Sequence, residues 1–160
     1  MPVSCMFYLN NERMSVLQCP GLGAVAAFSG DGSSIDNPAA TAKQDEGPLP
    51  KGTYYIIDRQ SGGHLGWLWD AVKDALVHSQ RSEWFALYRN DGVIDDYTVI
   101  DEVKRGHFRL HPVRRLGESK GCITLANPAQ FQRLRAFLKR QPTMRIPGTT
   151  IEYYGTVEVR

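Results

Sequence analysis

The sequence predicts a β-rich α+β domain with many short strands and about two main helices. Its 160 residues, with 42% hydrophobic and 22% charged, have the length and composition of one globular domain. Short segments rich in β-branched and aromatic residues recur between turn residues, and only two stretches have helical periodicity. Because no internal repeat is visible, we expect residues 1–160 to form one domain.

The expected strands are short and follow one another along most of the chain. Asn10-Asn11 predicts a hairpin turn between the first two strands, and Asn90-Asp91-Gly92 predicts a second hairpin turn. In chain order, the segments expected to be strands are Ser4–Leu9, Met14–Gln18, Ala24–Phe28, Thr53–Ile57, Trp84–Tyr88, Tyr97–Ile100, His107–Leu110 and Ile151–Val159.

Two stretches predict helices. From Leu65 to about His78, apolar residues recur at i, i+3, i+4, i+7 and i+11, which places them on one helical face. The second helix is expected to start at Asn127-Pro128, an N-cap followed by proline at the first helical position, and to end near Arg140.

A long connection separates the third and fourth expected strands. Residues Ser29 to Pro50 are rich in Gly, Ser, Asn and Pro. Long loops in small domains are usually functional or disordered. The segment is therefore either a cover for a substrate groove or a plain surface connection.

Charge and hydropathy argue against several classes of partner. A formal net charge of +2 gives no support for nucleic-acid binding. No run approaches the roughly 20 apolar residues of a spanning helix, so we expect no membrane insertion. The N-terminus lacks the basic and apolar regions of a cleavable signal peptide, so the protein is expected to be made in the cytoplasm and exported by another route.

Three cysteines are present, and none forms a CxxC motif, so neither a zinc ribbon nor a thioredoxin-type motif is supported. We expect Cys5 and Cys19 to be two small apolar core residues. A bridge between them in an oxidising compartment is the alternative. No metal or cofactor is expected.

The segment HPVRRLGESKGCITL, residues 111–125, combines a cysteine with a histidine. Cys122 is a candidate nucleophile if His111 takes its proton, because the thiolate is the reactive form. His107 is the competing base, since strand alternation would place it on the same face as His111. A structural Cys122 buried in the apolar run CITL is the alternative to a nucleophile.

Two neighbours of Cys122 could assist acyl transfer. Gly121 would let the backbone approach a substrate closely, as an oxyanion hole requires. Ser119 would add a hydroxyl to the hole or orient the loop. Either Glu118 or a backbone carbonyl could orient His111.

Several segments in order resemble the L,D-transpeptidase fold family. That family carries a proline-glycine element before a strand, found here as GPLPKGTYYI, and a signature of His, Ser or Thr, Gly and Cys that falls on His111, Ser119, Gly121 and Cys122. The segments AFSGDG, DNPA and EWFALYRNDGVIDD make the chain most similar to the type VI secretion L,D-transpeptidase effectors of enterobacteria.

The sequence departs from the wider family near the cysteine. The spacer after His111 is short, Lys120 stands where many members have His, and Thr124 stands where many have Arg. Since that Arg normally helps to hold the carboxylate of the substrate, we expect Arg109, Arg114 or Lys120 to take over this contact.

The resemblance implies a β-sandwich or barrel domain that acts on peptidoglycan stem peptides. Cys122 would attack the carbonyl of meso-diaminopimelate and release D-alanine, with His111 as base and then acid. Water would complete an L,D-carboxypeptidase reaction, and a D-amino acid would complete an exchange. The implied partners are the type VI secretion machinery and a cognate periplasmic immunity protein, with action in the periplasm of the target cell. The alternatives are another cell-wall cysteine amidase or peptidase, or a non-catalytic domain that binds the cell wall or a secretion partner.

Overall fold

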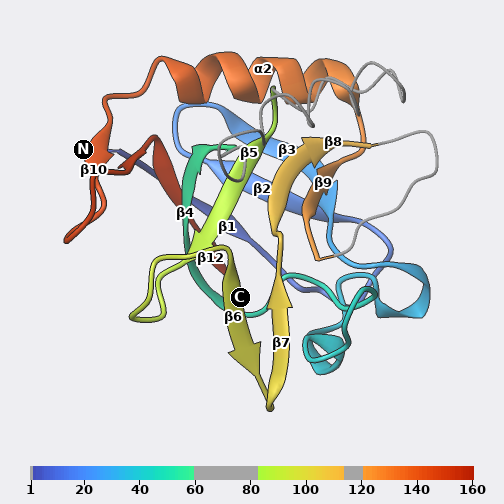
Figure 1. Ribbon diagram of the computed structural model, residues 1–160. Helices are drawn as coiled ribbons and strands as arrows, with labels where there is room; N and C mark the ends of the chain where they lie inside the picture. The colour runs from blue at the N-terminus through green and yellow to red at the C-terminus, as the bar shows by residue number, and fades with distance from the viewer. Residues whose placement is uncertain (1, 60–82, 114–120) are drawn as a thin grey trace, which may run out of the picture.

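A closed barrel of eight strands forms the centre of the computed structural model, which describes residues 2–59, 83–113 and 121–160 (Figure 1). Of the two architectures expected, sandwich and barrel, the structure is therefore a barrel. Around it lie, in order, β1 (Val3–Phe7), β12 (Gly155–Val159), β4 (Gly52–Asp58), β5 (Phe85–Arg89), β8 (Arg109–Pro112), β9 (Ile123–Leu125), β3 (Gly23–Phe28) and β2 (Ser15–Cys19).

Two of the strand pairs in this barrel are parallel and the others are antiparallel. β1 pairs in parallel with β12, which places the first and last strands of the chain side by side. β8 pairs in parallel with β9, which brings the residues around His111 beside those that follow Cys122. The strand β9 had been expected only as an apolar run, because three residues are too few for a clear alternation.

Side chains that alternate along the strands fill the barrel. In β2 the burial alternates strictly, with Ser15, Leu17 and Cys19 inside and the residues between them exposed. The same alternation holds in β12, whose Val157 and Val159 point into the core.

One α-helix, α2 (Pro128–Lys139), lies across one end of the barrel (Figure 1). The Asn127 side chain caps it by accepting a hydrogen bond from the amide of Ala129 at 2.9 Å. Phe131, Leu134 and Leu138 are buried against the core, as the apolar stripe predicted. The helix expected between Leu65 and His78 lies outside the described residues, so within those residues one α-helix is present rather than two.

A two-stranded hairpin of β6 (Tyr97–Ile100) and β7 (Val103–Gly106) projects from the barrel (Figure 1). Its turn residues Asp101 and Glu102 both have positive φ, at 48° and 67°, as a tight type I′ turn requires. The hairpin expected at Asn90-Asp91-Gly92 was wrong, because β5 pairs with β4 and β8 and leaves β6 to pair with β7.

The last expected strand is divided in two. β11 (Glu152–Tyr153) pairs with β10 (Met144–Arg145) in a small separate sheet, and β12 then returns to the barrel.

Cys5 and Cys19 form a disulfide between β1 and β2. Both cysteines are buried in the core, as expected, and the bridge that the sequence left as the alternative is present. The register pairs Met6 with Gln18, so Cys5 lies directly opposite Cys19, and their Cα atoms are 4.3 Å apart. Directly opposed cysteines at this spacing are close enough to bridge.

Candidate active site

The parallel pair β8–β9 places His111 and Cys122 on the same face of the barrel wall. Leu110 pairs with Ile123, and both point into the core. Because side chains alternate along a strand, His111 and its partner Thr124 point to the opposite face. Cys122 directly precedes β9, and the alternation of that strand, continued back by two residues from Thr124, assigns Cys122 to the same face as His111.

A backbone carbonyl orients the imidazole of His111. Its Nδ1 lies 2.7 Å from the carbonyl oxygen of Pro112 and can only donate there, which leaves Nε2 with its lone pair. Nε2 lies 3.4 Å from Oγ1 of Thr124. Of the two orienting groups considered from the sequence, the backbone carbonyl is present, and Glu118 lies outside the described residues.

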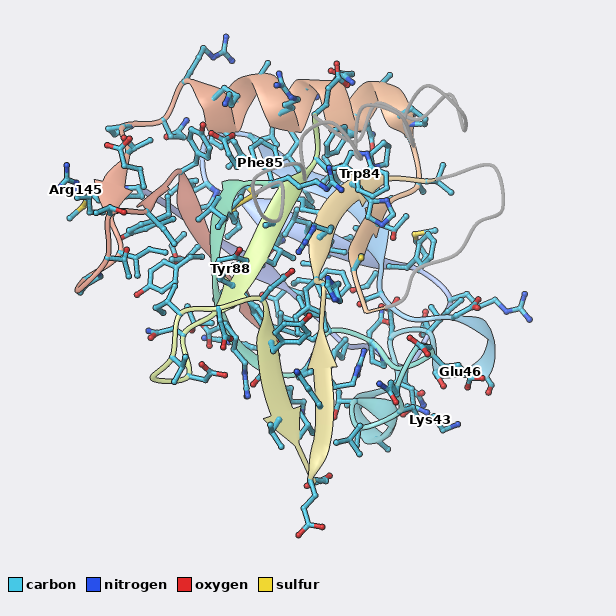
Figure 2. The ribbon with its side chains drawn as sticks, viewed as in Figure 1. Lys43, Glu46, Trp84, Phe85, Tyr88 and Arg145 are labelled. Atoms are coloured by element: carbon cyan, nitrogen blue, oxygen red, sulfur yellow. A yellow bond between two sulfur atoms is a disulfide. The ribbon has the colours of Figure 1, made fainter. Side chains whose placement is uncertain are left out.

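Trp84 covers the imidazole. Its ring stacks on that of His111 with centroids 4.4 Å apart and an interplanar angle of 22°. Figure 2 labels Trp84 immediately before β5, beside β8 and β9. With this cover His111 is only 2% exposed, so its ring has one defined orientation.

His107 does not share the face of His111, and the expectation that it would was wrong. Its φ of 58° breaks the strand before β8 begins, so the alternation does not reach it. Its ring is held on the side of the β6–β7 hairpin, with Nδ1 3.2 Å from Asp96 and Nε2 3.0 Å from the hydroxyl of Tyr97. It is the backbone carbonyl of His107 that faces Cys122, at 3.8 Å from Sγ.

Gly121 is required at its position by its backbone and by its neighbours. Its φ is +84°, and a Cβ there would lie 2.5 Å from Nη2 of Arg105 and 3.0 Å from the ring of Phe108. The sequence pointed to close approach by a substrate. The structure adds close approach by two side chains of the protein itself.

Arg109, expected to bind a substrate carboxylate, already binds one within the protein. Its two Nη atoms lie 2.7 Å and 2.8 Å from the two carboxylate oxygens of Asp96, a bidentate pair. Burial opposes the charge of this guanidinium, but the hydrogen bond and the charge of Asp96 outweigh burial and raise the pKa of Arg109.

Arg105 is a site residue that the sequence did not single out, except as one of several basic residues near the cysteine. It is only 3% exposed and lies on β7. Its guanidinium donates to the carbonyls of Thr41, Gly47 (2.8 Å) and Pro48 (3.2 Å). Burial lowers its pKa, and Coulombic attraction from Tyr54, Asp45 and Cys122 opposes that effect.

The long segment from Ser29 to Pro50 is an ordered loop beside this site. Ser29 links its two ends, because Oγ accepts from the amide of Leu49 and its own amide donates to Asp36, both at 2.8 Å. The loop contains two short 3₁₀ helices, Gly32–Ser34 and Pro38–Ala40.

A pocket of about 220 Å³ lies between this loop and the hairpin. Two of its lining residues, Arg105 and His107, also contact Gly121 and Cys122 respectively. The pocket is lined by Gln44, Asp45, Tyr97, Lys104, Arg105, Gly106 and His107.

The remaining expected site residues, Ser119, Arg114 and Lys120, lie outside the described residues. Within the described part of the chain, no three His, Cys, Asp or Glu side chains gather closely enough to hold a metal ion.

The fold and site define a β-barrel domain with a buried cysteine and histidine on the outer face of one parallel strand pair. The model of the Tlde1 domain family matches residues 23–149, which is most of the chain and includes every expected site residue. The chain therefore belongs to the Tlde1 domain family, a family of type VI secretion effectors with an L,D-transpeptidase-like domain. Neither a curated protein nor a solved structure matched the chain significantly.

A search of the described helices for membrane spans found none with the necessary length and hydropathy.

Proposed function

We propose that this effector is a cysteine-dependent peptidoglycan enzyme, an L,D-carboxypeptidase that also exchanges D-amino acids. One observation carries the proposal. In a domain of an effector family, the β8–β9 pairing brings a fixed imidazole, His111, beside the strand that Cys122 immediately precedes.

The proposed reaction begins with the thiolate of Cys122. It attacks the carbonyl of meso-diaminopimelate in a tetrapeptide stem, and the bond to D-alanine breaks. His111 accepts the thiol proton at Nε2 and passes it to the departing amine. The thioester is then hydrolysed by water, which regenerates the thiol and completes an L,D-carboxypeptidase cycle. If the amine of a D-amino acid attacks instead, the product is an exchanged stem.

The orientation of His111 supports its role as the base. Because the carbonyl of Pro112 holds the proton on Nδ1, the lone pair of Nε2 lies on the side of Thr124, two residues after Cys122. The Trp84 ring stacked on the imidazole limits its rotation.

The positive charge around Cys122 supports its role as the nucleophile. Arg105 and Arg109 both interact electrostatically with Cys122, and Arg105, which unlike Arg109 is not paired with a described carboxylate, is the cation that favours a thiolate over a thiol. In this proposal the backbone at Gly121 and the Ser119 hydroxyl stabilise the oxyanion. Arg114 and Lys120, with Arg109 already paired to Asp96, are the proposed contacts of the stem carboxylates.

The proposed site of action is the periplasm of a target cell, where the stem peptides are found and where a producing cell would need an immunity protein. The Cys5–Cys19 disulfide supports an oxidising destination of this kind, because disulfides persist in the periplasm and are rare in the cytosol.

Incubation of the purified protein with tetrapeptide muropeptides, followed by mass spectrometry, tests the proposal. We expect loss of D-alanine, and mass exchange when a D-amino acid is added. Cys122→Ala should lower the rate by about a thousandfold or more, and His111→Gln by about 10²–10⁴-fold.

His107→Asn is the matched control, since its ring faces the hairpin and asparagine tolerates positive φ. It should keep most of the activity. Release of whole stems from the glycan would instead indicate an amidase. Toxicity in the periplasm that survives Cys122→Ala would indicate a non-catalytic binding domain.

A further inference from the structure

Two arginines interact with Cys122, but their charges are compensated differently. Arg109 is neutralised by a bidentate carboxylate, Asp96, so the pair has no net charge. Arg105 is bound by three neutral carbonyls, and no carboxylate within the described residues lies at ion-pair distance from it.

A buried cation without a counter-ion is costly, so the anions near Arg105 matter. Three groups attract it, namely Tyr54, Asp45 and Cys122. Burial raises the pKa of Tyr54, so its hydroxyl is neutral at ordinary pH. Asp45 is exposed, and water screens its charge. Of these three groups, a thiolate at Cys122 would be the buried anion that offsets the charge of Arg105.

Arg105 also joins the long loop to the backbone beside the cysteine. Its Nη1 binds Thr41 and Pro48, and its Nη2 binds Gly47. The same Nη2 lies so close to Gly121 that a Cβ there would approach to 2.5 Å. One guanidinium thus packs the segment 41–48 against the residue that precedes the nucleophile.

We propose that Arg105 is a positioning residue that fixes the segment 41–48 beside Gly121 and stabilises Cys122 as a thiolate through its uncompensated charge. This inference rests on the proposed role of Cys122 as the nucleophile.

Titration of the Cys122 thiol tests the charge effect. Because Cys5 and Cys19 form a disulfide, Cys122 is the one cysteine that titrates in the unreduced protein. The pH midpoint is measured from the rate of alkylation by iodoacetamide and from thiolate absorbance relative to Cys122→Ser. Absorbance needs no reagent access to a sulfur on a residue only 8% exposed.

Arg105→Gln should raise the midpoint by about 1 unit or more, and Arg105→Lys, which keeps the charge, should leave it close to the wild-type midpoint. The matched control is Arg109→Gln combined with Asp96→Asn, which removes a pair of zero net charge and should also change the midpoint little. His111 and the carbonyl of His107, which lies 3.8 Å from Sγ, are retained in all of these variants.

The loop effect has its own measurement. Lys43 is exposed on the outer side of the loop (Figure 2), so trypsin can report on how firmly the segment is held. Both Arg105 variants should increase cleavage after Lys43 by about tenfold, because neither side chain can bind three carbonyls as a guanidinium does. Cleavage after Arg13, in the distant β1–β2 turn, should be unchanged.

The charge effect would be overturned if the thiol midpoint were unchanged in folded Arg105→Gln. It would also be overturned if Arg109→Gln combined with Asp96→Asn shifted the midpoint as far as Arg105→Gln does. If Arg105→Gln does not fold, a raised midpoint in Arg105→Lys would overturn it, because the charge is still present. Unchanged cleavage after Lys43 would overturn the loop effect. A wild-type midpoint near the ordinary thiol value, without activity on muropeptides, would instead overturn the proposed function itself.

Discussion

The two parallel strand pairs of the barrel have the same pairing geometry and very different outer faces. On β1–β12 the outward residues, such as Ser4 and Glu158, are at least partly exposed, as in an ordinary barrel wall. On β8–β9 the outward residues His111 and Thr124 are as buried as the core residues between them. Burial of polar groups costs free energy unless they find partners, and here Nε2 of His111 lies 3.4 Å from Oγ1 of Thr124.

The two parallel strand pairs also differ in what stabilises them. A disulfide joins β1 to β2, its neighbour on the side away from β12, so a covalent link in the core anchors this wall. On the β8–β9 wall the Trp84 ring stacks on His111, and Arg105 binds the segment 41–48 beside Gly121. Changes to the first wall should therefore alter stability, and changes to the second should alter reactivity first.

Among changes that distinguish the two walls without removing Cys122 or His111, Gly121→Ala should have the largest effect. The added methyl group would need positive φ and would collide with Arg105 and Phe108, so we expect the rate on muropeptides to fall at least about a hundredfold. Gly148→Ala is the matched control, because its φ of +78° imposes similar strain while nothing lies within 4 Å of the new Cβ. Equal losses of activity in both variants would attribute the effect to backbone strain alone.

Loss of the disulfide should have the next largest effect, on stability. For a sequence separation of 14, its removal by Cys5→Ala with Cys19→Ala should lower the free energy of unfolding by about 3 kcal/mol. Chemical denaturation measures this change. The double variant should not respond to reductant, whereas Cys122→Ala should be destabilised by reductant as much as the wild type is. If the folded double variant also lost most of its activity on muropeptides, the expectation that changes to the first wall alter stability alone would be contradicted.

A buried carboxyl in the long loop should make stability depend on pH. Burial raises the pKa of Asp36 to about 7 from 3.8, against the opposing hydrogen bond from Ser29. Between these two pKa values the native state binds more protons than the unfolded state, so the free energy of unfolding falls as pH rises. The contribution of Asp36 to stability is therefore complete below about pH 4 and is lost as the pH rises through 7. The decrease should be about 2 kcal/mol between about pH 5 and pH 7. Asp36→Asn should remove this slope, and Asp101→Asn, at an exposed turn, should retain it. If the dependence of stability on pH persists in Asp36→Asn, groups other than Asp36 are responsible for it.

The smallest effect is expected at the helix that covers the barrel end. Asn127→Ala removes the side chain that accepts from the amide of Ala129, so thermal unfolding should show a loss of about 1 kcal/mol. Arg133→Ala, on the exposed face of the same helix, should change stability little. Since the buried side chains of the helix pack into the core, and neither substitution changes one of them, activity at low temperature should be unaffected by both.

Much of the fold follows from local signals in the sequence. Seven of the eight barrel strands were expected from composition and turns, and α2 from its cap and apolar stripe, because these features depend on residues close in sequence. The hairpin assigned to Asn90-Asp91-Gly92 failed because a turn signal does not specify which strand pairs with the next. The short strand β9 gave too few residues for a pattern.

The candidate site, like the fold, could be predicted from the sequence only in part. His111, Cys122 and Gly121 could be selected from residue chemistry and from resemblance to a family. The contacts of His111 with Trp84, Pro112 and Thr124 could not, because residues 84 and 124 are brought to it by strand order and register.

The sequence by itself determined the strand-rich class, the helix α2 and the pair of residues suited to thiol chemistry, since each depends on local propensity or on residue type. Only the tertiary structure decided that the sheet closes into a barrel, that Cys5 meets Cys19, and that Arg105 reaches across to Gly121. These are long-range contacts, set by the register of strands far apart in the chain, and no local pattern specifies them.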